Sequence, residues 1–328
     1  MSARAQEGSH RGLSLQEVHM RKCRLCTIMF VVVGLVIALV SCCRFALYVS
    51  PGIFYEPGEL AVEVISLSGD DAPVAMDIYT PSECGRYPVV MFQHGFTAPI
   101  SVYETILTRL ASHGFVVVAP QMYSPFDGTA LPTPEEEAAL GVDIIRWLDR
   151  NLQKVVPVTA DMRLLGLAGH SRGGQTAYRM ALDVPRKIRA LAGVDPVDGL
   201  EIFGQTPAIT GPLTFRIPTY ILGTGLGPVV VGGFIACAPE EVGPRHFYEA
   251  NPSPSWLITA TEYGHADMLD EEDFAPVCPG GEDRDGMRAL TGGTLAAFFS
   301  GTLQKNDEAL LVLSDEAAAP VPVMMEMK

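Results

Sequence analysis

Residues 164–175 read LLGLAGHSRGGQ, and they join an apolar run to a helical pattern through a short turn that carries a serine. Gly169 and Gly173 stand two residues before and two residues after Ser171, which gives the pattern G-x-S-x-G. Small residues at these positions let a strand turn sharply into a helix and hold the serine in a strained backbone conformation. The segment therefore predicts a strand, an elbow and a helix, with the serine hydroxyl clear of the sheet and pointing at substrate.

Short apolar runs alternate with helical patterns on both sides of this elbow. Residues 58–67 and 73–80 alternate apolar and polar residues around a Gly-Asp-Asp turn, which predicts an antiparallel hairpin. The other runs are continuous and often rich in valine, as in strands that are covered on both faces. We therefore expect an α/β-hydrolase fold, with a mostly parallel central sheet, helices on both faces, and ligands beyond the carboxyl ends of the strands. The predicted strands are residues 87–92, 115–119, 164–168, 188–194, 219–222 and 256–259, and the further predicted helices are residues 101–113, 133–153 and 285–299.

The two ends of the chain differ in composition from this central part. Residues 1–24 are polar and net basic, whereas residues 25–43 contain no charge. At about 1.5 Å per residue, the uncharged segment has nearly the length of a bilayer core, so it predicts one N-terminal apolar helix that anchors the protein in a membrane. The alternative is a targeting segment that is later removed. We place the catalytic domain at residues 55–302, and we expect residues 303–328 to be an acidic tail that is a surface strand or partly disordered.

Charge and cysteine content exclude some classes of function. The formal net charge of −15, without a stripe of Lys and Arg after residue 44, argues against binding to nucleic acid. The seven cysteines show no zinc spacing, so we expect no metal site. Cys84, Cys237 and Cys278 fall in the predicted catalytic domain, where one disulfide and partly buried free thiols are both compatible with the sequence.

A serine hydroxyl is a weak nucleophile, so it needs a base within hydrogen-bond reach and an acid that orients the base. His265 is the predicted base, because it lies on a loop between the last predicted strand and the closing helix. His170 abuts the serine but is expected to point elsewhere on the elbow. The strand of residues 219–222 is followed by no carboxylate, while the strand before it ends in Asp195. Asp195 is therefore the predicted acid, and Asp198 remains the alternative.

The oxyanion that forms during acyl transfer needs two backbone N–H donors. One is expected from Arg172, directly after the nucleophile, and the other from the loop of residues 93–97, where Phe96 is our choice. His94 in the same loop is expected to brace the loop and to transfer no proton.

The loop of residues 120–132 follows a core strand on the side where substrates bind. Its apolar residues Met122, Tyr123 and Phe126 are predicted to line the substrate pocket, and the alternative is a packed surface loop.

Five blocks of the sequence are more specific than the elbow alone: GHSRGG at residues 169–174, GVDPVDG at 193–199, LGTGLGP at 222–228, CAP at 237–239 and YGHADMLD at 263–270. In consistent order over residues 58–300, the sequence resembles the chlorophyllase family. By this resemblance, Ser171 is the nucleophile, Asp195 the acid and His265 the base. The family implies hydrolysis of the ester between phytol and the propionate arm of chlorophyll, through an acyl-serine and without a cofactor.

The resemblance also implies a small lipid-like substrate and a chloroplast membrane as the location, with the endomembrane or secretory route as the alternative. An anchor at residues 25–43 suits a substrate with a long hydrocarbon tail, because both then partition into the membrane. A broader carboxylesterase or lipase is the alternative activity, since the same triad attacks any accessible ester. A non-catalytic binding protein is disfavoured, because all three triad candidates and both oxyanion loops are present.

Overall fold

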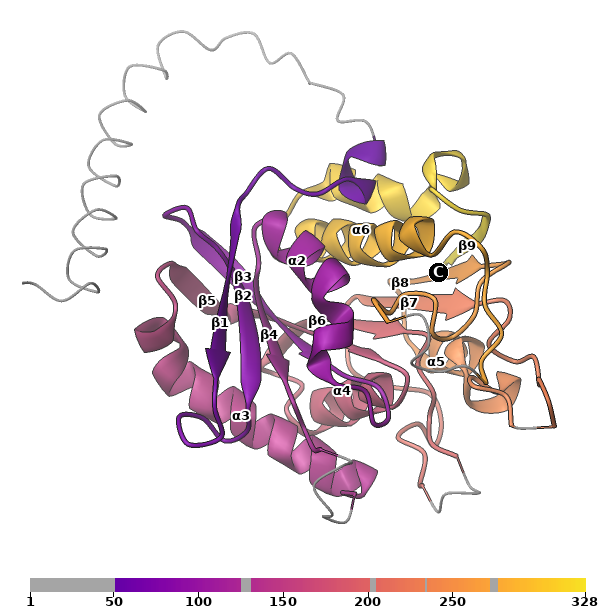
Figure 1. Ribbon diagram of the computed structural model, residues 1–328, viewed down its shortest axis with the longest axis horizontal. Helices are drawn as coiled ribbons and strands as arrows, with labels where there is room; N and C mark the ends of the chain where they lie inside the picture. Colours follow the sequence, from indigo (N-terminus) through magenta and orange to yellow (C-terminus); the bar gives the residue numbers. More distant parts are fainter. Residues whose placement is uncertain (1–50, 125–130, 201–204, 234, 272–276) are drawn as a thin grey trace, which may run out of the picture. The chain divides into compact units, whose positions relative to one another are not determined.

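The computed structural model describes residues 51–124, 131–200, 205–233, 235–271 and 277–328. Within these residues, nine strands form one sheet in the order β1-β2-β4-β3-β5-β6-β7-β8-β9 (Figure 1). The strands are β1 (Val62–Leu67), β2 (Met76–Pro81), β3 (Arg86–Gln93), β4 (Val116–Pro120), β5 (Thr159–His170), β6 (Ile188–Val194), β7 (Thr219–Thr224), β8 (Ser255–Ala260) and β9 (Val323–Met327). The helices are α2 (Glu104–Ser112), α3 (Pro134–Val155), α4 (Arg172–Asp183), α5 (Pro244–Ala250) and α6 (Arg284–Leu303), with short 3₁₀ helices η1 (Pro51–Tyr55), η2 (Ile100–Tyr103), η4 (Glu240–Val242), η5 (Asp307–Ser314) and η6 (Glu316–Ala318).

The centre of the sheet is parallel and its two edges are antiparallel. Strands β4, β3, β5, β6, β7 and β8 pair in parallel, whereas β1 and β2 form the predicted hairpin and β2 joins β4 antiparallel. The carboxyl ends of the parallel strands therefore meet at one edge, which is where a mostly parallel sheet presents its ligand site.

Helices cover both faces of the sheet, and each face has its own apolar core. Along β3, Val90 and Phe92 pack in the core under α2 and α6, while Val89 and Met91 pack in the core under α3 and α4. This division follows from the alternation of side chains along a strand. The two layers are visible in Figure 1, and together with the strand order they confirm the α/β-hydrolase fold that the sequence predicts.

The longest helix begins where its sequence predicts. Thr133 caps α3 by accepting a hydrogen bond from the backbone N–H of Glu136, and the Glu136 carboxylate accepts one from the N–H of Thr133. This reciprocal box satisfies two donors that a helix start leaves without partners, and Pro134 supplies a first residue that needs no N–H. Because α3 is fixed at this end, Glu137 on its first turn is held next to Arg172, which directly follows Ser171.

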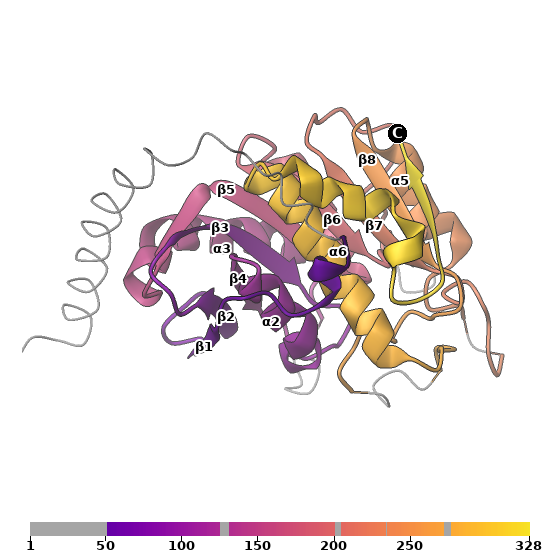
Figure 2. The same ribbon diagram turned by 90° about the horizontal axis from the view of Figure 1, so that it is seen from above.

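The C-terminal segment forms a surface strand, which is one of the two expected alternatives, and it belongs to the folded domain. Helix α6 extends to Leu303, and β9 then pairs antiparallel with β8, from Trp256 opposite Met327 to Ala260 opposite Val323 (Figure 2). Four of its acidic residues are exposed and Asp315 is half-buried, while Val312 and Leu313 are buried in the core. Residues 303–328 are thus part of the folded domain, because their apolar residues complete one edge of the sheet.

Residues 25–43, predicted to form a membrane anchor, lie outside the described residues. Within the part of the chain that the structure describes, no helix is both long enough and apolar enough to cross a membrane.

Candidate active site

The elbow between β5 and α4 holds Ser171 in a backbone conformation that few residues adopt. Its φ is 55° and its ψ is −124°. A Cβ on Gly169 would lie 2.2 Å from the carbonyl oxygen of Gly173, and a Cβ on Gly173 would lie 2.3 Å from the carbonyl oxygen of Gln93. Both glycines are therefore required by close backbone approach, and the serine hydroxyl is turned out of the sheet toward a cavity.

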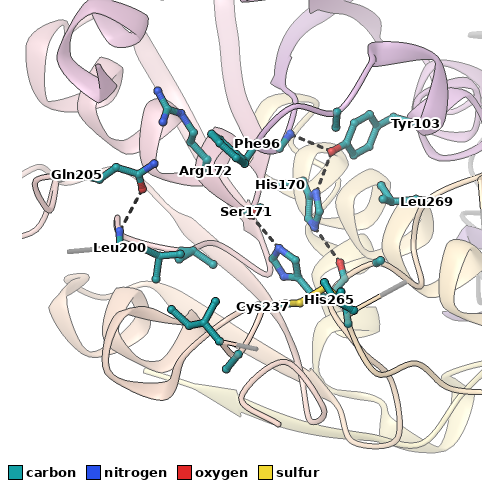
Figure 3. Close-up of a pocket in the computed structure, with 18 residues that line it drawn as sticks. Phe96, Tyr103, His170, Ser171, Arg172, Leu200, Gln205, Cys237, His265 and Leu269 are labelled. Carbon is teal, nitrogen blue, oxygen red and sulfur yellow. Dashed lines mark hydrogen bonds between the residues drawn. A yellow bond between two sulfur atoms is a disulfide. The ribbon is translucent and has the colours of Figure 1, made fainter. Parts of the chain in front are cut away.

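Three side chains from separate parts of the chain form a hydrogen-bonded relay at this elbow. His265 Nε2 lies 2.8 Å from Ser171 Oγ (Figure 3). On the other side of the ring, His265 Nδ1 lies 2.6 Å from Asp195 Oδ2. A carboxylate accepts only, so Nδ1 carries the proton and Nε2 is free to accept the serine proton. The structure thus brings together the three residues that the sequence singled out, in the arrangement of a nucleophile, a base and an orienting acid.

The carboxylate of Asp195 is fixed by donors from the neighbouring strand. The backbone N–H of Thr224 donates to Oδ1 at 2.8 Å, and the Thr224 hydroxyl donates to Oδ2 at 2.9 Å. Asp195 follows β6 at a φ of 41°, and its own N–H bonds to the carbonyl of Leu222 at 2.6 Å. This kink directs the fully buried carboxylate toward His265.

The alternative acid, Asp198, faces another part of the fold. Its Oδ1 accepts the N–H of Ala208 at 2.6 Å, and its Oδ2 accepts the N–H of Ile209 at 2.9 Å and lies 3.1 Å from His246 Nε2. These contacts hold a loop in place, and none of the partners belongs to the relay. Asp267, two residues after His265 in the chain, accepts the N–H groups of Gly264 and Gly281, both at 2.7 Å.

A cavity of about 260 Å³ opens beside the relay. Its walls are mostly apolar, with the Ser171 hydroxyl and the His265 ring on one side (Figure 3). The lining residues come from the loops that follow the parallel strands, as expected for this sheet. Those that shape its walls are Phe96, Tyr103, Leu200, Ile235, Leu269 and Val277.

The two predicted oxyanion residues both line this cavity next to the serine. Arg172 is the first residue of α4, so its backbone N–H is one of those that a helix start leaves without an intrahelical partner. Its side chain is buried and donates to Glu137 Oε2 at 2.7 Å, and the guanidinium carbon lies 5.7 Å from the ring centroid of Phe96. Burial raises the pKa of Glu137, against the opposing effect of Arg172. The arginine side chain is thus held against the oxyanion loop while its backbone lies beside the serine.

His94 braces the loop that carries Phe96, which agrees with the role expected from the sequence. Its Nδ1–H donates to the carbonyl of Gly95 at 2.8 Å, and its Nε2 accepts the N–H of Met122 at 3.0 Å. Burial lowers the pKa of His94 to about 4, so the ring is neutral at physiological pH. Both ring nitrogens are engaged in bracing the loop, so neither is free to exchange a proton with substrate.

The predicted pocket loop is placed differently from our expectation. Met122 and Tyr123 are buried in the core beneath α3, and neither is among the described residues that line the cavity. The Tyr123 hydroxyl instead accepts the N–H of Thr97 at 3.3 Å, and its ring lies 5.6 Å from the Arg172 guanidinium. They turn inward because apolar side chains after β4 can reach this second core. Phe126 lies outside the described residues.

Sequence reasoning missed Tyr103 and the partners of His170, which points away from the serine hydroxyl as expected. His170 Nε2 lies 2.9 Å from the carbonyl oxygen of His265, and its Nδ1 lies 2.8 Å from the Tyr103 hydroxyl. The sequence pointed to His170 only through its place next to the serine, and it gave no signal for Tyr103. Both are almost fully buried.

A disulfide joins two of the cavity's walls, which settles one of the alternatives left open by the sequence. Cys237 and Cys278 are bonded, and both line the cavity. In the described part of the chain, no cluster of three or more His, Cys, Asp or Glu side chains is placed to hold a metal ion. The polar groups at the cavity are those of acyl transfer: a hydroxyl, a base with its acid, and backbone donors.

Comparison with known proteins gives a consistent result. The family model described as Chlorophyllase matches residues 51–328. Chlorophyllase-2 of Arabidopsis thaliana is 34% identical over 282 residues, which cover 80% of this chain and 87% of the relative. Chlorophyllase-1, chloroplastic, of Citrus unshiu is 34% identical over 286 residues, covering 81% of this chain and 84% of the relative. Cutinase 2 of Thermobifida cellulosilytica is 25% identical over 223 residues, covering 68% and 74%.

Proposed function

The chain belongs to the chlorophyllase family, and from that premise we propose that it hydrolyses the phytyl ester of chlorophyll to chlorophyllide and phytol. The observation that carries this proposal is the relay from Ser171 Oγ through His265 to Asp195 at the wall of an apolar cavity. Family membership supports a hydrolase of carboxylic esters with a lipid-like substrate, and the relay supports a serine mechanism within that class.

In the first half of the proposed reaction, Ser171 Oγ attacks the ester carbonyl carbon. His265 Nε2 takes the hydroxyl proton, and Asp195 stabilises the resulting imidazolium through Nδ1–H. The negative charge on the carbonyl oxygen is stabilised by the backbone N–H groups of Arg172 and Phe96. When the tetrahedral intermediate collapses, the bond to the phytyl oxygen breaks, and His265 returns the proton to that oxygen. Phytol leaves and the chlorophyllide acyl group stays on Ser171.

In the second half, water replaces the alcohol. His265 Nε2 takes a proton from the water as its oxygen attacks the acyl carbon, and the same backbone donors stabilise the second oxyanion. Collapse of this intermediate returns the proton to Ser171 Oγ and releases the chlorophyllide carboxylic acid. No cofactor takes part in this scheme, because the proton and acyl transfers account for every bond that forms or breaks.

The dimensions of the cavity support a substrate that enters only in part. Binding pockets that bury most of a drug-sized ligand have volumes of roughly 300–1,000 Å³, whereas this cavity has about 260 Å³. We infer that the ester and the adjoining hydrocarbon enter the cavity, while the pigment ring remains at its mouth. The exposed side chains of Phe96, Ile235 and Val277 provide an apolar rim there.

The test is the release of chlorophyllide from chlorophyll by the purified full-length protein in detergent. Ser171→Ala serves as the inactive control, and p-nitrophenyl butyrate serves as a simple ester. We expect the wild-type protein to cleave both substrates and the variant to cleave neither. Cleavage of the simple ester without release of chlorophyllide would refute the chlorophyll proposal.

Cleavage of the simple ester alone would favour a broader carboxylesterase, for which the cutinase relatives provide support. The same relay attacks any ester that reaches it, so the loops that line the cavity decide between the two activities. The ratio of kcat/KM for chlorophyll and for the simple ester distinguishes them directly.

We also propose that the protein acts at a chloroplast membrane, held there by residues 25–43. Support comes from the lack of charge in this segment and from the two Citrus relatives whose names include the word chloroplastic. The full chain should float with vesicles of chloroplast lipids, and a chain without residues 1–50 should not. Equal flotation of both would refute the anchor.

A further inference from the structure

Four groups form a continuous hydrogen-bonded chain behind the relay. The backbone N–H of Gly95 donates to the Tyr103 hydroxyl at 2.9 Å. The Tyr103 hydroxyl lies 2.8 Å from His170 Nδ1, and His170 Nε2 lies 2.9 Å from the carbonyl oxygen of His265 (Figure 3). These groups come from the loop after β3, from η2, from the end of β5 and from the loop after β8.

The direction of every bond in this chain is fixed by its two ends. A backbone carbonyl only accepts, so His170 Nε2 carries the proton and donates to His265. A neutral imidazole then has an acceptor at Nδ1, which receives the Tyr103 hydroxyl proton. The Tyr103 oxygen in turn accepts the N–H of Gly95. Burial and the neighbouring His265 lower the pKa of His170 far below its ordinary value, so the ring stays neutral and keeps this pattern.

This hydrogen-bonded chain connects two parts of the site whose relative position matters for the reaction. Gly95 directly precedes Phe96, whose N–H is a proposed oxyanion donor, while His265 is the proposed base. The His170 ring also packs on the His265 ring, with centroids 4.6 Å apart. Tyr103 and His170 are 1% and 3% exposed, so water does not substitute for either contact.

We propose that Tyr103 and His170 are positioning residues that hold the oxyanion loop and the His265 loop at one fixed separation; this inference rests on the function proposed above. We call the chain Gly95–Tyr103–His170–His265 the Tyr103–His170 brace. In the transition state, His265 must accept the serine proton while the backbone donors stabilise the oxyanion. A brace that fixes the distance between these groups therefore stabilises the transition state and does not affect binding of the ester. Its loss should therefore lower kcat and leave KM nearly unchanged.

The experiment uses the full-length protein with p-nitrophenyl butyrate. Tyr103→Phe removes a single oxygen atom and should lower kcat about tenfold or more, with KM within about threefold. Tyr220→Phe is the matched control, because Tyr220 is fully buried and its hydroxyl bonds to Thr294 at 2.7 Å, away from the cavity. His170→Leu should lower kcat further, and His170→Gln should recover part of the loss, since its amide N–H reaches toward the same carbonyl.

Two further readouts separate positioning from general damage to the fold. The double variant Tyr103→Phe/His170→Gln should lose little more than the more damaged single variant, because both changes break one chain. The proton NMR resonance of His265 Nδ1–H, which reports its bond to Asp195, should shift or broaden in Tyr103→Phe and stay unchanged in Tyr220→Phe.

The proposal is overturned if Tyr103→Phe keeps a kcat within twofold of Tyr220→Phe, or if the losses in the double variant simply multiply. If the wild-type protein cleaved no ester, the proposed function would fail. The NMR comparison would then still decide whether the brace positions His265.

Discussion

Replacement of Asp195 by Asn is expected to remove nearly all turnover, and the surrounding donors show why. The Thr224 N–H fixes an acceptor at the Oδ1 position. The Asn oxygen must therefore take that place, which puts the amide NH₂ group at the Oδ2 position, 2.6 Å from His265 Nδ1. An NH₂ group donates, so Nδ1 must become an acceptor and the proton must move to Nε2. In that tautomer, His265 is unable to accept the Ser171 proton.

The loss can be given a magnitude. In serine hydrolases, the wrong tautomer of the base costs about 10⁴-fold in kcat, which corresponds to about 5 kcal/mol of transition-state stabilisation. The fold should be little affected, since the Asn oxygen keeps the bond from the Thr224 N–H and the Thr224 hydroxyl can turn to accept from the NH₂ group. Assays with p-nitrophenyl butyrate, together with a urea unfolding curve, measure the two effects separately.

Asp198→Asn is the matched comparison, because it makes the same change three residues later in the chain. Asp198 accepts two backbone N–H groups and has no contact with His265. The amide cannot accept at both oxygens, so we expect a loss of about 1–3 kcal/mol in the free energy of unfolding. The kcat of the folded fraction should stay within a few-fold of wild type. Equal losses of kcat in the two variants would refute the assignment of Asp195 as the acid.

Three further predictions concern the surroundings of the site. The pKa of His94 is about 4 in the folded protein and 6.5 ordinarily, so the unfolded chain binds a proton first as the pH falls. Between about pH 6.5 and pH 4, this group should therefore lower the free energy of unfolding by up to about 3 kcal/mol. His94→Gln should flatten the pH dependence of the free energy of unfolding in urea titrations, and an unchanged slope would contradict the buried neutral ring. Gly95→Ala should lower kcat by up to about 100-fold in a folded protein, because its Cβ would lie 2.9 Å from His170 Nδ1; wild-type kinetics would show that the loop tolerates the methyl group. The Cys237→Ser/Cys278→Ser double variant opens a loop of 41 residues' separation and should lower the free energy of unfolding by up to about 4 kcal/mol, measured by thermal melting against wild type, and an unchanged melting temperature would refute this.

The fold was predictable because its signals are local. Continuous valine-rich runs, the capping box at Thr133 and the glycines of the elbow each specify a structure within a few residues. The end of the chain was harder to predict. Its Ala, Pro and acidic residues are compatible with a surface strand and with partial disorder, and only the pairing of β9 with β8 shows that the edge of the sheet lies there.

The choice between Asp195 and Asp198 was open in the sequence for a physical reason. Both carboxylates follow β6, and the direction of each depends on donors that are distant in the chain, at Thr224 for the first and at Ala208 and Ile209 for the second. Composition and spacing carry no information about these donors. The family resemblance favoured Asp195, and the geometry now gives an independent reason for the same choice.

The misplaced pocket residues have a similar cause. An apolar residue after a core strand can pack either in the substrate cavity or in the core under α3 and α4. The sequence does not distinguish these two apolar environments. Met122 and Tyr123 take the core under α3. Tyr103 gave no signal at all, because its contacts lie 8 residues away at Gly95 and 67 residues away at His170.

Strained backbone conformations occur in three separate parts of the site. Among the described residues, Thr97, Ser171 and Asp195 are three of the four non-glycine residues with positive φ, and they stand in the loop after β3, at the elbow and directly after β6. Such conformations cost on the order of 1–3 kcal/mol each and persist only where the surroundings over-determine them. Here each strained residue has its N–H bonded to a neighbouring part of the site: to the Tyr123 hydroxyl, to the carbonyl of Val194 and to the carbonyl of Leu222. Tyr123 therefore holds Thr97, one residue after Phe96, from the core side. The same logic applies to Tyr103 at Gly95, so the two tyrosines fix the loop around Phe96 from its two ends.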